Sequence, residues 1–405
     1  MIKVAIVGFG NIGSGVAIAL EKGREGLKSL LGEEIRLAYI VDIADLSKTP
    51  YRDLVTTDFS VVENDPEVSI VVETIGGQKV AYDYTRRALL AGKTVVTSNK
   101  ELVSERGCEL TAIAKEKGVH YLFEASVGGG IPILQPLVQC LAANHIEEIT
   151  GILNGTTNYI LTRMFTQNAS FETALAEAQE LGYAERNPSA DVDGVDACRK
   201  IAILADLAFG VNVPPAKVYT EGIRAITAAD TEFAKKAGCA VKLLGRAVRR
   251  SDDSAFVLVA PHFIDFSSPL ASVSGVFNGI SVVGDLVGET MFYGSGAGKL
   301  PTASAVVGDI LYGAGLGKTA AQFVWRESDD GNVAPIGEMT NAFFARVAAQ
   351  DASAFSAAFP GAQALGTIGE EAGFLTPVVS FGQVQSTLSA LEKQGVKALS
   401  LIRKM

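Results

Sequence analysis

The first forty-two residues constrain the fold most tightly, because a strand, a glycine loop and a helix follow one another without a gap. IKVAIV (residues 2–7) is an apolar, β-branched run typical of a buried parallel strand, and GFGNIGSG leads directly into a helical pattern. A second strand pattern, IRLAYIVD, ends in an acid. This order predicts a βαβ unit at the start of a parallel sheet.

The glycine loop reads G-x-G-x-x-G, with glycines at positions 8, 10 and 13. A bare match could be a plain tight turn, but between a strand and a helix it predicts dinucleotide binding, with the helix N-terminus facing the phosphates. Asp42 ends the second strand, where an acid accepts hydrogen bonds from ribose hydroxyls and favours NAD over NADP. Lys48 and Arg52 argue for NADP, and an ordinary exposed aspartate is the third alternative.

Further strand patterns follow at 69–77, 93–100 and 119–130, with helical patterns between them. Alternating strands and helices predict a doubly wound, Rossmann-type parallel sheet whose ligands lie at the carboxyl ends of its strands. The residues from Glu73 to Gly77 and from Ser98 to Lys100 therefore belong at the mouth of the cofactor site. Lys100 could equally be a solvated or capping lysine.

Composition narrows the class of protein further. With 405 residues the chain exceeds what one core usually supports, so two or three domains are expected. A net charge of −10 disfavours nucleic acid and membrane as partners. The four cysteines and three histidines lack the spacing of a zinc site or a disulfide framework. A strand that starts at residue 2 leaves no room for a secretory signal, so we expect a cytoplasmic protein.

Residues 182–200, GYAERNPSADVDGVDACRK, gather one glutamate and three aspartates ahead of a lysine. A calcium loop is disfavoured, because its twelfth position needs a glutamate and holds Lys200. Asp196 and Lys200 lie at i and i+4 of a predicted helix, a common surface pair. The apolar residues 202–205 instead indicate a buried helix, whose charges need partners and usually have a function. The NGTTN loop (residues 154–158) either holds a small polar ligand or simply caps a helix.

Taken together, the motifs resemble those of homoserine dehydrogenases over roughly residues 1–320. The resemblance rests on VGFGNIGSG, SNKEL, FEASVGGGIPI, NGTTNYIL, GYAERNPSADVDGVDACRK and GSGAGKLPTASAVVGDI. It implies NAD(P)-dependent interconversion of L-homoserine and L-aspartate 4-semialdehyde, in the branch from aspartate to threonine and methionine. It also implies at least a homodimer.

The resemblance assigns roles residue by residue. Lys200 corresponds to the proton donor, Lys100 to a second catalytic lysine and Asp196 to the acid one turn before the donor. The substrate-binding positions are Glu185, Asp191, Gly155 and Thr156. The cofactor-binding positions are Gly8, Gly10, Asn11, Ile12, Gly13, Asp42, Thr74 and Lys100. A monovalent cation such as Na⁺ would be held by Glu124 and by the carbonyl groups of Val127, Gly129 and Ile131.

General chemistry agrees with these roles, because hydride delivery to an aldehyde leaves charge on oxygen that a cationic donor must neutralise. Two departures from the family pattern stand out. Asn187 replaces the usual aspartate before the proline, which removes one charge from the substrate loop. Ala44 stands where NADP-using members often carry arginine, which strengthens the expected preference for NAD.

The last 80 residues suggest a small module that begins β-α and ends β-α-β, after a polar linker at 326–337. It is similar to an ACT regulatory domain, but its Asp-x-Pro-Gly turn is replaced by DASA (residues 351–354), which favours a structural or dimerising role. Three domains are thus expected: a dinucleotide-binding domain (1–130 with 295–320), a catalytic and dimerisation α+β domain (131–294) and the ACT-like α+β module (338–405).

Two rival functions remain to be weighed. An aspartate-semialdehyde dehydrogenase would need a nucleophilic cysteine, and Cys198 falls on the wrong face of the predicted helix. A catalytically idle nucleotide sensor would have no need to retain both Lys100 and Lys200.

Overall fold

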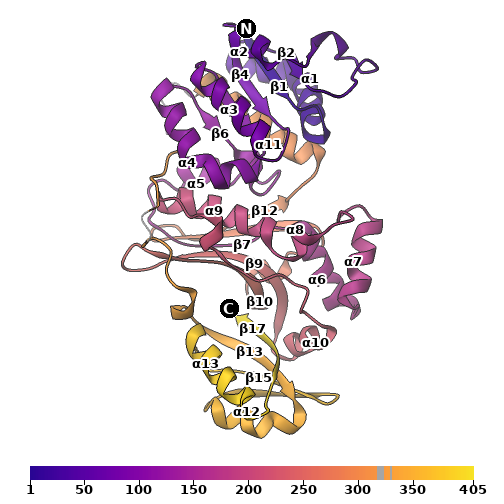
Figure 1. Cartoon of the computed structure of the whole chain (residues 1–405), viewed down its shortest axis with the longest axis vertical. Helices are drawn as coiled ribbons and strands as arrows, with labels where there is room; N and C mark the ends of the chain where they lie inside the picture. Colours follow the sequence, from indigo (N-terminus) through magenta and orange to yellow (C-terminus); the bar gives the residue numbers. More distant parts are fainter. Residues whose placement is uncertain (317–322, 329–330) are drawn as a thin grey trace. The chain divides into compact units, whose positions relative to one another are not determined.

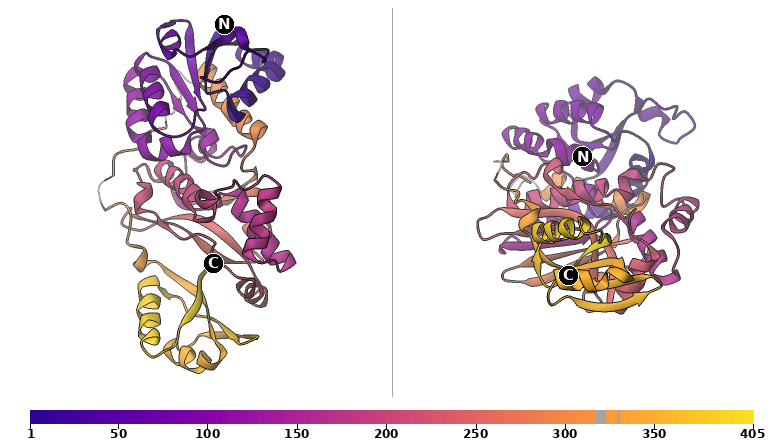
Figure 2. Two further views of the ribbon diagram at one scale, coloured as in Figure 1. Left: turned by 45° about the vertical axis from the view of Figure 1, so that its right-hand side comes forward. Right: turned by 60° about the horizontal axis from the view of Figure 1, so that its bottom comes forward.

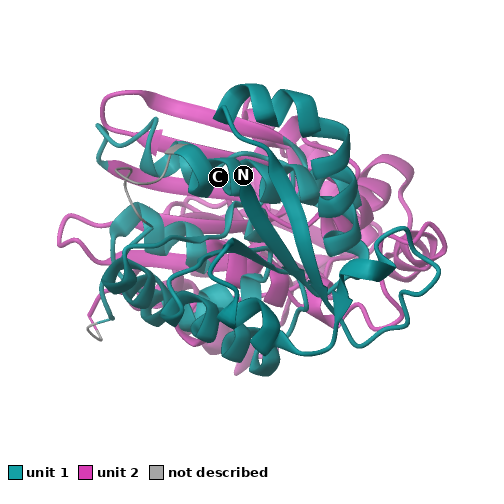
Figure 3. Ribbon diagram, turned by 90° about the horizontal axis from the view of Figure 1, so that it is seen from above, with its two compact units in different colours: residues 1–145, 202–215, 294–328 teal, residues 146–201, 216–293, 329–405 magenta. Residues whose placement is uncertain are grey.

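The computed structural model describes residues 1–316, 323–328 and 331–405 of the chain. These residues form two compact units, each assembled from separate stretches of sequence (Figure 3). Unit 1 comprises residues 1–145, 202–215 and 294–328, and unit 2 comprises residues 146–201, 216–293 and 329–405. Residues 317–320 of the expected returning segment and residues 329–330 of the expected linker lie outside the described part.

Unit 1 is built on a parallel sheet of six strands in the order β3-β2-β1-β4-β5-β6 (Figure 1). The strand order reverses between β1 and β4, which is the position where doubly wound sheets bind nucleotides. The sequence prediction of a Rossmann-type parallel sheet is therefore confirmed. The strands are β1 (Ile2–Val7), β2 (Ile35–Val41), β3 (Val55–Thr56), β4 (Val68–Glu73), β5 (Thr94–Thr97) and β6 (Tyr121–Leu122).

The helices of unit 1 form where the sequence places caps and apolar faces. Asn99 caps the helix that follows β5, its side chain accepting a hydrogen bond from the Leu102 N–H, and Gly118 ends that helix at a positive φ of 67°. Gly15 lets the first helix approach Lys299 and Ala303 closely. The helices are α1 (Asn11–Leu31), α2 (Phe59–Asn64), α3 (Lys79–Leu90), α4 (Lys100–Lys117), α5 (Leu134–Val138) and α11 (Lys299–Leu311).

One predicted strand is much shorter than expected. The pattern at 119–130 forms a strand only at Tyr121–Leu122, and a 3₁₀ turn at Glu124–Ser126 follows. Gly128 and Gly129 then adopt positive φ values of 71° and 57°, which no strand can accommodate. Apolar character at 119–123 reflected burial in the core, whereas the glycines signalled the turn.

Unit 2 contains a mixed sheet of eleven strands in all. Its main path runs β12-β11-β7-β9-β10-β17-β13-β15-β14, with β8 and β16 pairing at the side. The strands before residue 300 are β7 (Ile146–Ile152), β8 (Tyr219–Thr220), β9 (Cys239–Arg249), β10 (Ala255–Asp265), β11 (Phe277–Gly284) and β12 (Gly288–Ser295). The helices are α6 (Gly155–Gln167), α7 (Phe171–Glu180), α8 (Ser189–Val192), the first part of α9 (Val195–Phe209) and α10 (Ala228–Lys236). The residues of α9 from 202 onward are counted in unit 1.

The C-terminal segment shares this sheet (Figures 1 and 2). It consists of β13 (Thr340–Ala348), α12 (Ala352–Ala358), β14 (Gln363–Ile368), β15 (Glu371–Leu375), β16 (Val379–Ser380), α13 (Phe381–Glu392) and β17 (Ala398–Lys404). Leaving aside the two-residue β16, the order is β-α-β-β-α-β, which matches the expected alternation. Its last strand pairs with β10 in parallel, His262 opposite Arg403, so the sheet of unit 2 continues into this segment. Its identity as an ACT domain stays a prediction.

Two buried contacts of α10 further bind the C-terminal segment into unit 2. The Arg346 guanidinium on β13 donates to Asp230 at 2.9 Å and to Glu371 at 2.6 Å. Gly373 leaves room for the ring of Phe233, which a Cβ at that position would meet at 2.5 Å. Among the described residues, no helix is long and apolar enough to cross a membrane.

Candidate functional site

The glycine loop of unit 1 has the backbone that its sequence predicts. Gly8 has a φ of +90°, and a Cβ there would lie 2.9 Å from the backbone of Thr74 and Ile75. A Cβ on Gly13 would lie 2.0 Å from the carbonyl oxygen of Gly8, so only glycine lets the helix start this close to the strand. Gly10 faces open space and caps α1 without a side-chain hydrogen bond. The amide groups of the first turn, at Asn11 and Ile12, are thereby available to an anion.

Residues at the end of β4 fix the shape of this loop. The Thr74 hydroxyl donates to the Gly8 carbonyl at 2.7 Å. The buried Glu73 carboxylate accepts hydrogen bonds from the Ile75 N–H at 2.8 Å and the Thr97 hydroxyl at 2.6 Å. Burial raises the pKa of Glu73 above its usual value, while these hydrogen bonds oppose the rise. Thr74 therefore acts on the glycine loop itself, and Glu73 supports the neighbouring turn.

Asp42 lies at the carboxyl end of β2, next to the glycine loop. Its carboxylate accepts hydrogen bonds from the Phe9 N–H at 2.5 Å and from the Ala44 N–H at 2.8 Å. Phe9 belongs to the loop, so the carboxylate borders the place where the adenosine ribose of a bound dinucleotide is expected. Asp42 is half-buried, so it is not an ordinary exposed aspartate, and its role toward a cofactor stays a prediction.

Lys100 is the first residue of α4, three residues beyond the end of β5, and is half-buried. The preceding Asn99 is buried and also donates from its amide group to the Gly77 carbonyl at 2.7 Å. This contact joins the two loops that the sequence placed at the cofactor mouth. Lys100 belongs to unit 1 and Lys200 to unit 2.

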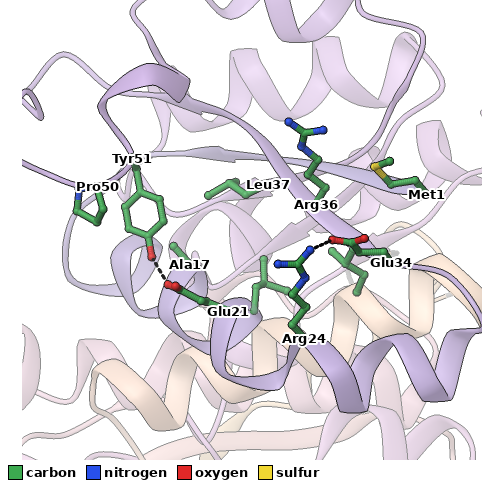
Figure 4. A pocket seen from close by; sticks show the side chains of 11 residues that line it. Met1, Ala17, Glu21, Arg24, Glu34, Arg36, Leu37, Pro50 and Tyr51 are labelled. Carbon is green, nitrogen blue, oxygen red and sulfur yellow. Dashed lines mark hydrogen bonds and ion pairs between the residues drawn. The ribbon is translucent and has the colours of Figure 1, made fainter.

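A groove of about 550 Å³ opens elsewhere on unit 1, between α1 and β2 (Figure 4). Tyr51 borders it and donates to Glu21, while Arg24 pairs with Glu34 along its rim. None of the residues expected to bind the cofactor lines this groove. Its size alone therefore does not make it the dinucleotide site.

In unit 2, the predicted pair on α9 is buried. The Lys200 Nζ donates to the Asp196 carboxylate at 2.8 Å and to the Leu153 carbonyl at 2.8 Å. The two side chains are only 9% and 6% exposed, which excludes the surface-pair interpretation. A lysine held between a carboxylate and a carbonyl is fixed in one orientation, with its nitrogen in a place of low dielectric constant.

Asn154 connects this pair to the substrate loop. Its amide group donates to Asp191 at 2.7 Å and to Asp196 at 2.9 Å. Its carbonyl oxygen caps α6 by accepting from the Thr157 N–H at 2.9 Å. One side chain thus performs both functions that the sequence left open for the NGTTN loop: it caps a helix and it joins the polar cluster. We call Asn154, Asp191, Asp196 and Lys200 the lysine cluster.

The predicted substrate-binding residues differ in their burial and in their contacts with the lysine cluster. Burial raises the pKa of Asp191, and the nearby Asp196 carboxylate adds to the rise. The Thr156 hydroxyl donates to the Tyr183 carbonyl at 2.7 Å, joining α6 to the loop before α8. Gly155 begins α6 and packs too closely on Val276 for any side chain. Glu185 is exposed, and within the described residues its carboxylate has no hydrogen bond, so the structure does not bring it into the lysine cluster.

The expected cation-binding segment lies in unit 1. The Glu124 carboxylate accepts three hydrogen bonds at the start of α5, from the N–H groups of residues 133–135 at 2.6, 2.9 and 2.6 Å. Its own N–H donates to the Asp309 carboxylate at 2.8 Å. Val127, Gly129 and Ile131 are buried, and their carbonyl oxygens accept no hydrogen bond within the described residues. Unpaired carbonyl groups of this kind suit a hard cation.

Asp309 was not predicted as a site residue, and Asn154 and Glu73 were placed near the site without a role of their own. Asn154 sat in a loop whose polar residues were noted, but its double contact with two aspartates depends on tertiary structure. Glu73 was noted only for its position at a strand end. Asp309 is buried on α11 and accepts from Glu124, 185 residues away in sequence, so no local signal could reveal the contact.

Comparison with known proteins agrees with this geometry. The profile described as "Homoserine dehydrogenase, NAD binding domain" matches residues 8–124, and the one described as "Homoserine dehydrogenase" matches residues 132–311. The homoserine dehydrogenase of Synechocystis sp. is 44% identical over 317 residues, which cover 76% of this chain and 72% of that protein. The Bacillus subtilis enzyme of the same name is 42% identical over 330 residues, or 80% and 76% of the two chains.

Solved structures extend the similarity to the whole chain. A homoserine dehydrogenase from Thiobacillus denitrificans matches with a TM-score of 0.91 at 34% identity, covering 100% of this chain and 98% of that one. The S. aureus homoserine dehydrogenase at pH 8.5 gives 0.82 at 31%, with the same coverage. A hyperthermophilic archaeal homoserine dehydrogenase mutant in complex with NADPH gives 0.65 at 27%, covering 77% and 97%.

The parallel sheet with its glycine loop, together with the buried lysine cluster, defines an enzyme of the nicotinamide-dependent oxidoreductase class. The two relatives are 44% and 42% identical to this chain over 76% and 80% of its length. The chain belongs to the homoserine dehydrogenase family.

Proposed function

We propose that this enzyme interconverts L-homoserine and L-aspartate 4-semialdehyde with NAD(P), in the branch from aspartate to threonine and methionine. The observation that carries the proposal is the buried Lys200, which has Asp196 and the Leu153 carbonyl as acceptors. A member of this family needs one group that exchanges a proton with the substrate oxygen, and the lysine cluster supplies it. Nucleophilic chemistry at Cys198 is not required.

Lys200 acts as the acid and base of the proposed reaction. A bound nicotinamide cofactor supplies or accepts the hydride at C4 of the substrate. In the direction of homoserine oxidation, neutral Lys200 removes the hydroxyl proton as the C–H bond breaks, and in reduction the Lys200 ammonium returns a proton to the aldehyde oxygen. Asp196 keeps the nitrogen oriented and stabilises its charged form. Lys100 is the second catalytic lysine and acts at the cofactor side.

The substrate is a zwitterion, so its ammonium group needs carboxylates. We assign this role to Asp191 and Glu185, with Gly155 and Thr156 forming the adjacent wall. Asp191 is already held by Asn154, whereas the exposed Glu185 would have to reach the substrate from its loop. Asp191 is therefore expected to contribute more binding energy than Glu185.

The experiment that tests the function is direct. Purified protein is assayed at alkaline pH for reduction of NAD and of NADP that depends on L-homoserine. Turnover with at least one cofactor is the expected result. No turnover with either cofactor, in protein that binds reduced cofactor, would overturn the proposal.

Asp42 decides the cofactor. A 2′-phosphate next to its carboxylate would be repelled, so NAD is the expected cofactor and NADP the poorer one. Asp42→Ala should raise the ratio of kcat/KM for NADP to that for NAD by about tenfold, because one unit of charge repulsion near a surface amounts to about 1–2 kcal/mol. Steady-state kinetics with each cofactor measure the ratio. An unchanged ratio would remove Asp42 from cofactor selection.

The carbonyl oxygens of Val127, Gly129 and Ile131 are proposed to hold a monovalent cation such as Na⁺. Glu124 belongs to the same proposed site, and its carboxylate accepts from the N–H groups of residues 133–135, which follow these carbonyl groups in the chain. Thermal unfolding in NaCl and in tetramethylammonium chloride of equal ionic strength tests the site. A higher Tm in NaCl is expected, and equal Tm values would contradict it.

We further propose a cytoplasmic enzyme that forms at least a homodimer, and a C-terminal segment with a structural or dimerising role. The sheet shared by β10 and β17 supports a structural role. Sedimentation velocity of the whole chain tests the oligomeric state, and a monomer at assay concentration would contradict it.

A further inference from the structure

The last strand of the chain carries a buried cation. Arg403 on β17 has a side chain that is 3% exposed, and its guanidinium lies over the rings of Phe381 at 4.3 Å and Tyr219 at 4.9 Å. Its carboxylate partner is Glu221, which accepts from Arg403 Nη1 at 3.2 Å. Glu221 also accepts from the Tyr219 hydroxyl. A charge this deeply buried requires such a partner, so Arg403 and Tyr219 together fix the position of Glu221.

Glu221 begins a short loop, residues 221–224, that lies directly against the segment carrying Asp191. The N–H of Ile223 donates to the Val192 carbonyl at 2.8 Å. Gly222 approaches the same carbonyl so closely that a Cβ would be 2.2 Å from it. Arg224 pairs with Asp193 at 2.5 Å. Three successive residues after Glu221 thus contact the backbone or side chains of residues 192–193.

The segment so contacted leads straight into α9. Gly194 has a φ of +83° and packs against Thr220, Val259 and the Glu221 carbonyl. Its own carbonyl accepts the Cys198 N–H at 2.8 Å, the first hydrogen bond of the helix that carries Asp196 and Lys200. Contacts within unit 2 therefore run without interruption from β17 to the lysine cluster.

We propose that Arg403 and Glu221 are positioning residues that set the place of Asp191 for the ammonium group of the substrate. The inference rests on the proposed function. It gives the C-terminal strand a task in substrate binding, performed through an ion pair and a loop rather than through contact with the substrate. Displacement of Asp191 by a fraction of an ångström weakens the substrate contact, whereas Lys200 keeps its own partners on α9 and at Leu153.

If Arg403 had only a structural role, removal of any buried ion pair in this region would have the same effect on substrate binding. Unit 2 offers a matched control for this alternative. Arg346 on the neighbouring strand β13 is also about 95% buried and also pairs with carboxylates, Asp230 and Glu371. Neither of those partners contacts residues 189–194 in any hydrogen bond or ion pair of the described residues. Arg403→Met and Arg346→Met therefore remove equivalent groups, of which only one leads to the substrate segment.

The test measures kinetics and backbone hydrogen exchange in the whole chain. Arg403→Met and Glu221→Ala should each raise KM for L-homoserine about tenfold, with kcat within threefold and KM for the cofactor unchanged. The double variant should have a KM for L-homoserine no higher than that of the more impaired single variant, because both substitutions break the same contact. Arg403→Lys should recover part of the loss. In Arg403→Met the amides of residues 189–194 should exchange faster, and in Arg346→Met they should not.

The outcomes separate this inference from the proposed function. Suppose that the wild-type protein oxidises homoserine, but Arg403→Met and Glu221→Ala leave KM for L-homoserine unchanged and Arg403→Met leaves the amide exchange of residues 189–194 unchanged. That result would overturn the inference and leave the proposed function standing. An equal rise in KM in Arg346→Met would do the same. Wild-type protein without turnover would overturn the proposed function, and exchange at residues 189–194 would then still decide whether Arg403 holds that segment. If Arg403→Met does not fold, Arg403→Lys and Glu221→Gln carry the same comparison with smaller effects.

Discussion

Three buried acids of unit 1 and the two acids of the lysine cluster in unit 2 are held in different ways. In unit 1 the carboxylates of Glu124 and Asp206 are hydrogen-bonded to backbone N–H groups, and Glu73 to two such groups and a hydroxyl. In unit 2 the carboxylates of Asp191 and Asp196 are held by the side chains of Asn154 and Lys200. Backbone N–H groups are too weakly acidic to act as catalytic proton donors, so acids held by them shape loops. An acid held by a lysine can serve acid–base chemistry.

The largest effect should come from breaking the side-chain cluster at its centre. Lys200→Ala removes the only proton-transfer group that we assign to the substrate oxygen, and kcat for homoserine oxidation should fall by about 10³–10⁴-fold. Binding of reduced cofactor, followed by fluorescence titration, should stay within twofold because the glycine loop belongs to unit 1. Loss of cofactor binding together with activity would instead point to misfolding, which circular dichroism would detect.

A smaller effect is expected from Asn154→Ser, which separates the two tasks of Asn154. Serine is a good N-cap, so the cap of α6 and the free energy of unfolding should change by less than about 0.5 kcal/mol. The two aspartates lose their shared amide donor, so kcat/KM for homoserine should fall by about 10–100-fold. Urea unfolding and steady-state kinetics measure the two quantities. Equal losses of stability and activity would show that Asn154 is only a cap.

The smallest effect on activity concerns an acid of unit 1, whose contribution to stability is visible only as a function of pH. Asp206 is fully buried, and burial raises its pKa well above the usual range, with the Val213 N–H as a partial offset. Because the pKa in the folded protein is the higher one, the stability from this group is complete below the unfolded pKa of about 3.9. It is lost as pH rises toward the folded value, by at most about 1.4 kcal/mol per pH unit.

Asp206→Asn keeps an oxygen for the Val213 N–H and does not ionise. The unfolding free energy of the variant relative to wild type should therefore rise between pH 4 and neutrality, while kcat stays within threefold. Urea titrations at several pH values give the comparison. A difference that does not change with pH would mean that Asp206 is not a titrating acid of the folded state.

The fold of unit 1 could be predicted from local signals. Gly8 and Gly13 are required by steric clashes with residues that the same βαβ unit supplies, so their spacing alone carries the information. The i,i+4 relation of Asp196 and Lys200 likewise follows from helix geometry, and the apolar residues after it correctly indicated burial. The predicted strand at 119–130 was wrong beyond residue 122. The positive φ angles of residues 128 and 129 belong to a turn and not to a strand, and the hydrogen-bond partners of Glu124 lie outside this stretch of sequence.

Long-range contacts could not be predicted. Asn154 meets Asp196 over 42 residues, Glu124 meets Asp309 over 185 and Arg403 meets Glu221 over 182. No periodicity or spacing encodes such pairs. The continuation of the unit 2 sheet into the C-terminal segment through β10 and β17 is equally invisible, since the sequence suggested a linker and a separate module.

The measurement that tests the account most directly is chemical rescue of Lys200→Ala by small primary amines during homoserine oxidation. The account predicts that turnover, once lost, returns in part as methylamine or ethylamine is added, and that the recovered rate follows the basicity of the amine, because the amine takes over proton exchange in the vacated space. A Lys200→Ala protein that turns over like the wild type without any amine would contradict the assignment of Lys200 as the proton-transfer group.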